Sequence, residues 1–322
     1  MPSLKLSFPL TARGEFAERV LVVLMALLFL AACQKSVIRQ TVSAEDEPVK
    51  PVSPFMTETN NKLSKAIFYN ALEKALERRG SALANLFDSE DAISRRIVEE
   101  YGALFLASEK VLPPPVCMFT SAEEVLQFQK QANVASATIA GATIELQSPA
   151  IEALLAARAE ANQKGLDITP RDGAEAARRS YDDTLRLWNS RFLPALEHWK
   201  KLGKLSREEI ENLKRLPVRE QVGAVLELEK RGIFFSTYFD KSILYSVAAP
   251  GTSQHLSMLA FDANEYADKK VRKILAKHGW FRTVKSDAPH FTFLGANEAD
   301  LPALGLKKIK TGDGEYWVPN VL

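Results

Sequence analysis

The chain has 322 residues, of which 42 are basic and 40 are acidic, so its formal net charge at pH 7 is only +2. No window gathers a long run of charges of one sign, which excludes the electrostatic footprint of a nucleic-acid-binding protein. The length is sufficient for one large domain or two smaller domains with well-buried interiors.

The N-terminal region has the features of a secretory signal. Lys5, Arg13 and Arg19 precede an unbroken apolar run over residues 20–32. This run is too short for a helix that crosses a bilayer, which needs roughly 20 apolar residues. It ends in Leu-Ala-Ala-Cys at Cys33, which resembles the bacterial lipobox, whose cysteine is acylated and becomes the first residue of the mature chain. The alternative is a buried N-terminal helix in which Cys33 has no special role.

Residues 1–33 are therefore predicted to be a lipoprotein signal, with Cys33 as the lipidation site and the bacterial cell envelope as the location. Gln34 and Lys35 do not supply the Asp that often retains lipoproteins in the inner membrane, which favours the outer membrane, facing the periplasm. Cys117 is then the only other thiol, so no intramolecular disulfide can form.

Two segments follow the signal. Residues 34–58 are polar, rich in Pro and Ser, and without periodicity, which predicts a disordered tether. Residues 59–135 form a helical segment, interrupted by three prolines at 113–115 and restarted by a capping-box pattern at 120–123. Its apolar residues recur at helical spacing: Leu63, Ile67, Ala71, Leu72, Ile93, Ile97, Tyr101, Leu104, Val125 and Phe128.

A second unit is predicted over residues 140–322. Ser148-Pro149 indicates a helix to about Lys164, and a short strand over 166–169 ends at the turn 170–173. A long helix should then run from Ala174 towards Trp199, and Ser206 should cap another. Residues 232–249 have the aromatic and β-branched content of strands. A helix over 266–278 and a strand that runs from 279–281 and carries His290 complete the unit.

Two of the four histidines lie in contexts that indicate a metal site. A Pro-Gly turn precedes His255, and Asp262 follows seven positions later. Imidazole and carboxylate are both good ligands for Zn²⁺, which in catalytic sites takes three protein ligands and leaves one position for water. His290 can supply the third ligand, and Asp287, three residues earlier, can reach the water.

These two segments resemble the S-x-H-x-x-G-x-A-x-D and E-x-x-H signatures of the D-alanyl-D-alanine carboxypeptidase and dipeptidase family. Ser253, His255, Ala260 and Asp262 match the first signature, and His290 matches the second. The resemblance covers roughly residues 140–296. It implies Zn²⁺ bound by His255, Asp262 and His290, and a peptidoglycan stem peptide as substrate.

Elements and resemblance together predict an α+β fold, in which a small, mainly antiparallel sheet with flanking helices cradles zinc behind an α-helical segment. Three departures from the signatures matter. Met258 replaces a Gly that often marks a positive φ. Pro289 stands where Trp is common. Asp287 replaces the catalytic Glu and is one methylene shorter, so the backbone must lie closer for it to act as a base.

The resemblance also implies an Arg that binds the terminal carboxylate of the substrate, with Ser253 as a further substrate-binding residue. Arg171 lies where the predicted strand ends, which is the expected place. Arg179 matches the motif letters better but was expected on the second turn or later of a helix, where a solvated side chain is the alternative.

The predicted function is zinc-dependent hydrolysis of D-alanyl peptide bonds in stem peptides by a lipid-anchored, carboxypeptidase-like enzyme. A first rival is a non-catalytic lipoprotein that binds peptidoglycan or acts as a scaffold, which the substitution at Asp287 supports. A second is a lipoprotein that resembles the family only at these motifs and binds no metal.

The lipobox yields a direct prediction. Replacing Cys33 with Ala should release the protein from the membrane fraction, because the acyl chains are its expected anchor. Fractionation of cells that express each form measures this, and persistent membrane attachment of the variant would contradict it.

Overall fold

A computed structural model describes residues 66–285 and 287–322, all within one compact unit, Ser53–Leu322. The predicted signal, tether and lipidation site at Cys33 lie outside the described residues, as does Leu63. The α-helices are α2 (Ile67–Arg78), α3 (Leu83–Leu86), α4 (Ala92–Tyr101), α5 (Ala122–Gln131), α6 (Ser148–Gln163), α7 (Tyr181–Lys201), α8 (Arg207–Arg215), α9 (Val218–Lys230) and α10 (Lys269–Lys277). In this part of the chain, no helix has the length and hydropathy to span a membrane.

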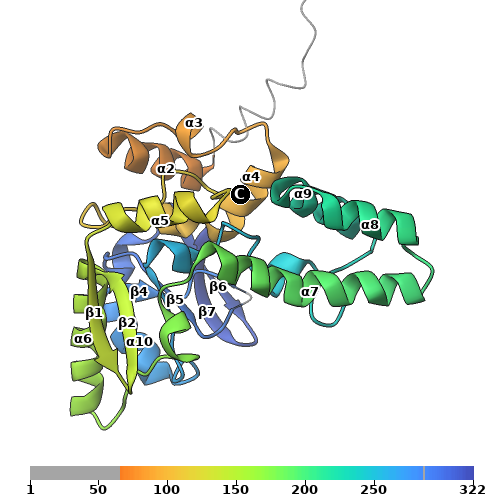
Figure 1. Cartoon of the computed structure of the whole chain (residues 1–322). Coiled ribbons are helices and arrows are strands. Elements are labelled where there is room, and N and C mark those ends of the chain that lie inside the picture. Colours follow the sequence, from red (N-terminus) through yellow and green to blue (C-terminus); the bar gives the residue numbers. More distant parts are fainter. Residues whose placement is uncertain (1–65, 286) are drawn as a thin grey trace, which may run out of the picture. The chain divides into compact units, whose positions relative to one another are not determined.

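The expected α+β class with small antiparallel sheets is confirmed (Figure 1). The strands are β1 (Val134–Ile139), β2 (Ala142–Gln147), β3 (Ala260–Asp262), β4 (Trp280–Phe281), β5 (His290–Phe293), β6 (Leu306–Thr311) and β7 (Gly314–Pro319). β1–β2 and β6–β7 are hairpins, whereas β3, β5 and β4 form a three-stranded sheet with β5 in the centre. α6 packs against the first hairpin, and α10 packs against α6 and β4.

The helical segment before residue 135 forms as the apolar spacing predicts. The carboxylate of Asp91 caps α4 by accepting two backbone N–H groups, and the hydroxyl of Ser121 caps α5. One detail of the predicted core face is wrong, because Ile67 is 51% exposed and Phe68 beside it is fully buried.

Helix starts in the second unit follow their capping residues. Ser206 forms the predicted cap of α8, as part of a complete capping box. The long helix begins at Tyr181 rather than at Ala174, because Ser180 and Asp183 form another capping box there. Residues 173–176 form a separate 3₁₀ turn, η2.

The strand predictions were the weakest. Residues 232–249 form no strand but loops around a 3₁₀ turn, η3 (Ile243–Tyr245), whose backbone N–H of Ile243 is bonded to the carboxylate of buried Glu229. The predicted strand 166–169 is reduced to one β-bridge, between Pro170 and Ala263. The strand expected to carry His290 is divided into β4 and β5.

One hydrophobic core includes side chains from α2 through to β6. Phe68 of α2 lies so close to Gly102 and Gly305 that a Cβ on either glycine would come within 3.0 Å of it. The backbone N–H of Phe68 also donates to the carbonyl of Asn320, at 3.2 Å. The helical segment and the C-terminal hairpin region are therefore packed together around this residue.

This packing predicts that Phe68→Ala lowers the free energy of unfolding by about 3–5 kcal/mol, because removal of a fully buried ring leaves a cavity beside Gly102. Ile67→Ala is the matched control and should cost about 0.5 kcal/mol or less, because that side chain is half exposed. Denaturant titration measures both changes. Equal effects at the two positions would contradict the packing described.

Candidate metal centre

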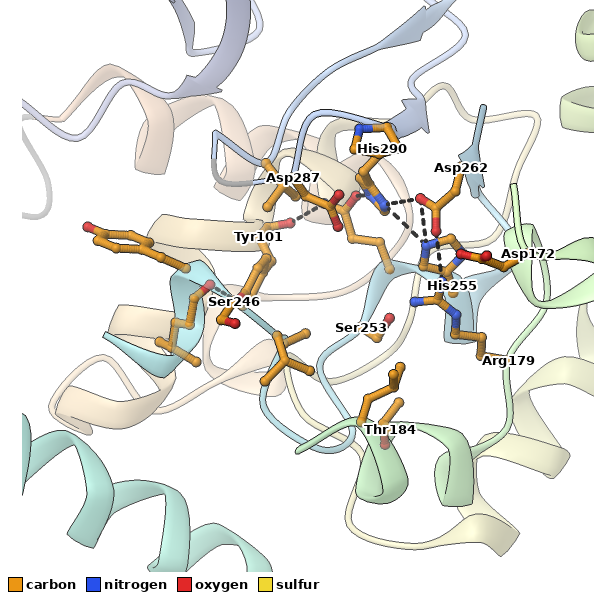
Figure 2. A pocket seen from close by; sticks show the side chains of 18 of the residues that line it. Tyr101, Asp172, Arg179, Thr184, Ser246, Ser253, His255, Asp262, Asp287 and His290 are labelled. Atoms are coloured by element: carbon orange, nitrogen blue, oxygen red, sulfur yellow. Dashed lines mark hydrogen bonds and ion pairs between the residues drawn. The ribbon is translucent and has the colours of Figure 1, made fainter. Parts of the chain in front are cut away.

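The β3–β5 pair brings together two of the three predicted ligands. In its antiparallel register, Asp262, the last residue of β3, lies directly opposite His290, the first residue of β5. Side chains of directly opposed residues point to the same face of the sheet. His255 joins them from the 3₁₀ turn η4 (Gln254–Ser257), and all three are at most 7% exposed (Figure 2).

Met258 sets the path of the chain between η4 and β3. It adopts the left-handed conformation, with φ 57° and ψ 33°, which glycine favours and which costs other residues roughly 1–2 kcal/mol. Its side chain is fully buried, and this burial offsets the strain. A methionine at the glycine position of the signature is thus compatible with a left-handed turn.

The three side chains present one atom each to a common point. His255 Nε2 lies 3.1 Å from His290 Nδ1 and 3.3 Å from Asp262 Oδ1, and His290 Nδ1 lies 3.2 Å from the same oxygen. Zinc–ligand bonds of 2.0–2.2 Å in a tetrahedron separate neighbouring ligand atoms by about 3.3–3.6 Å. The sides of the triangle are at or slightly below this range, and the cluster could hold a metal ion.

Hydrogen bonds behind the triangle fix the state of each imidazole. His255 Nδ1 lies 2.8 Å from the carbonyl of Ala177, which can only accept, so this nitrogen carries the proton. His290 Nε2 lies 2.8 Å from Gln254 Oε1, so it too is the protonated nitrogen. The two ring nitrogens that face the triangle then carry a lone pair and no proton. They lie beside Oδ1 of Asp262, which is also a hydrogen-bond acceptor. Three acceptors so close repel one another unless a cation lies between them.

The electrostatics of His255 and Asp262 agree with this state. Burial, the largest effect, lowers the pKa of His255 to about 4, so the ring is neutral at neutral pH. Asp262 forms an ion pair with Arg179 at 2.7 Å, which favours the ionised carboxylate. Neutral imidazole and ionised carboxylate are the forms that bind metals.

Arg179 completes the support of the triangle. Its Nη2 donates to Asp262 Oδ2 at 2.7 Å, which leaves Oδ1 for the triangle, and its Nε donates to the carbonyl of Glu175. The expectation that Arg179 lies within a helix is wrong, because it precedes the capping residue of α7, Ser180. It lies in the loop after η2, which brings it to Asp262.

The triangle opens on a pocket of about 420 Å³ whose lining includes Asp287, Arg171 and Ser253. The N–H of His290 donates to the carbonyl of Asp287 at 3.3 Å, so a four-residue turn holds both side chains at the pocket (Figure 2). Asp287 is open to solvent, yet the surrounding wall limits hydration of its carboxyl and raises its pKa. A raised carboxyl pKa is typical of a proton-transferring group.

Arg171 contrasts with Arg179. Its side chain is 44% exposed, and its guanidinium lies 5.6 Å from the ring centre of Tyr266 and 3.9 Å from Asp172. It is therefore available at the pocket rim, whereas Arg179 is only 15% exposed and is engaged by Asp262.

Two residues of the candidate site were not predicted from the sequence. Gln254 orients His290 and stands inside the first signature, immediately before His255, so its position was the available signal. Arg191 lines the pocket from α7 and donates to the hydroxyl of Ser246; nothing in its sequence context marked it.

No family model matches the chain, and neither a curated protein nor a solved structure is significantly similar to it.

The geometry predicts that His290→Ala lowers bound metal sharply, because it removes one of three converging donors. His278→Ala is the matched control, since His278 bonds to Glu160 on α6, away from the triangle. Elemental analysis after metal loading and gel filtration measures both. Full metal content in His290→Ala would exclude the triangle as the binding site.

Proposed function

We propose that this chain is a zinc-dependent peptidase that hydrolyses D-alanyl peptide bonds of peptidoglycan stem peptides. The observation that carries the proposal is the convergence of His255, Asp262 and His290 on one point, with their unprotonated atoms inward, at the wall of a pocket that also contains an acid. The match of these residues to the two signatures of the carboxypeptidase and dipeptidase family supports the substrate class.

The proposed mechanism gives each residue of the site a separate role. Zinc at such a site supplies a Lewis acid toward a peptide carbonyl and water. Asp287 would accept a proton from the attacking water and return it to the nitrogen of the leaving amine, so that the peptide bond is exchanged for a carboxylate and an amine. Its raised pKa suits both the acceptance and the return of that proton. Arg179 would act as a positioning residue that keeps Asp262 Oδ1 directed inward.

A stem peptide ends in a carboxylate, and Arg171 is the better placed of the two arginines to bind it. Its guanidinium is exposed at the rim, and its planar fork can grip a carboxylate with two hydrogen bonds. Ser253, half-buried in the pocket wall, is the proposed second contact.

The proposal includes an envelope location. A lipid anchor at Cys33 and a tether over 34–58 would hold the pocket beside the cell wall, where stem peptides occur. The location and the substrate therefore support each other.

The rival is a protein that retains the pocket and binds stem peptides without turnover. The shorter side chain of Asp287 favours it, since a general base must come within hydrogen-bond reach, roughly 2.6–3.2 Å, of the water. The two proposals differ in what changes at position 287 should do.

Asp287→Ala should lower turnover by ~10²–10⁴-fold, the usual contribution of a positioned acid or base, while zinc remains bound. Asp287→Glu tests reach, because a faster variant would show that the shorter carboxylate limits the rate. Product release from purified stem peptides, measured by chromatography beside zinc content, separates these outcomes. The same negligible hydrolysis by the wild type and both variants would overturn the peptidase and favour the binding protein.

A further inference from the structure

A second pocket, of about 390 Å³, is lined by residues of α10, β4 and the β6–β7 hairpin, elements that Figure 1 labels. His290 and Phe291 are neighbours on β5 and point to opposite faces of the sheet, and Phe291 lines this pocket. The metal centre and the second pocket are therefore on opposite sides of the same sheet.

The lining of the second pocket is strongly basic although the whole chain is almost neutral. Its acids are Glu298 and Glu315, and both are engaged by Lys308, at 2.7 and 3.7 Å. The basic residues are Lys269, Arg272, Lys273, Arg282, Lys308 and Lys310. Apart from Lys308, none of these forms an ion pair with a carboxylate among residues 66–285 and 287–322.

Three of these cations share one face of α10. Lys269, Arg272 and Lys273 stand at positions i, i+3 and i+4, where like charges destabilise a helix. Arg272 directs one guanidinium nitrogen to the carbonyls of Tyr266 and Ala267, which leaves its charge without a counterion in this part of the chain.

Arg282 adds a buried positive charge to those on α10. It is 4% exposed, its Nη1 donates to the carbonyl of Asp313, its Nη2 donates to the hydroxyl of Tyr316, and its guanidinium lies 3.9 Å from the centre of the Tyr316 ring. Its Nε has no partner among the described residues, and no carboxylate pairs with it there. A buried cation without an anion is costly, and a buried donor without an acceptor adds to that cost.

The two guanidinium groups lie close together at Gly314. A Cβ on this glycine would come 3.0 Å from Nη1 of Arg282 and 3.9 Å from Nη2 of Arg272. The glycine at the start of β7 therefore leaves the space beside both groups open. The half-buried indole of Trp317 forms another part of the same wall.

We propose that the second pocket binds the phosphate group of a phosphorylated ligand. Paired arginines match phosphate oxygens with parallel hydrogen bonds, and the surplus of lysines suits a ligand of more than one negative charge. The indole of Trp317 offers an apolar surface to the organic part of the ligand. The phosphate could belong to a soluble monoester or to a lipid headgroup, and binding measurements distinguish these sources.

The test compares the full chain with an Arg272→Gln/Lys310→Gln double variant, which changes exposed or half-buried side chains and leaves buried Arg282 intact. Lys204→Gln/Arg207→Gln, at exposed positions around the start of α8, removes the same number of charges and is the matched control. Titration calorimetry with inorganic phosphate and glycerol phosphate, at ionic strength matched with chloride, should show binding that is at least tenfold weaker in the double variant and unchanged in the control.

Sedimentation with vesicles identifies the source of the phosphate. If vesicles of phosphatidylglycerol, compared with vesicles of phosphatidylcholine, retain the wild type more than the double variant, the ligand is a headgroup. Binding of the soluble esters alone indicates a soluble ligand. Equal phosphate affinity in wild type and double variant, no binding beyond chloride, or binding of an oligonucleotide alone would overturn the proposal.

Discussion

The candidate site depends on one register. Because Asp262 and His290 are opposed across β3 and β5, a carboxylate and an imidazole point to the same place without any long side chain having to be restrained. A shift of one residue in this pairing would turn one of them to the other face, towards the aromatic side chains. The short three-stranded sheet is thus the part of the fold that builds the candidate site.

The strand register places the side chains, and hydrogen bonds on the far side of each imidazole then fix its orientation. Each histidine donates outward, to Ala177 and Gln254 respectively, and this decides which nitrogen faces the centre. Arg179 does the same for the carboxylate. The site is therefore preorganised for a cation by neutral groups and one guanidinium, with little left to rearrange on binding.

The sequence predicted the parts of this arrangement that have local signals. Caps such as Ser206 act over three residues, so they could be read directly. The motif match of His255, Asp262 and His290 singled out three side chains that the structure brings together. The hairpins were harder to predict from the sequence. The β1–β2 turn uses Ala140 and Gly141 with φ of 49° and 84°, but alanine gives no hint of a left-handed residue. Residues 232–249 carry strand-like composition yet form loops around a 3₁₀ turn and are only partly buried, which only tertiary contacts could decide. The basic pocket was missed because its charges come from separate segments, each short.

Gln254 connects the site to a distant part of the chain. Its side-chain oxygen serves His290, while its amide nitrogen donates at 2.8 Å to the carbonyl of Tyr101, at the end of α4. The helical segment that precedes residue 135 thus supplies a fixed point for a proposed metal ligand about 190 residues later. A protein shortened to residues 140–322 would keep every proposed ligand and lose the group that fixes the amide. The unit that builds the candidate site is accordingly larger than the segment that carries its motifs, because the backbone at Tyr101 fixes a side chain that holds His290.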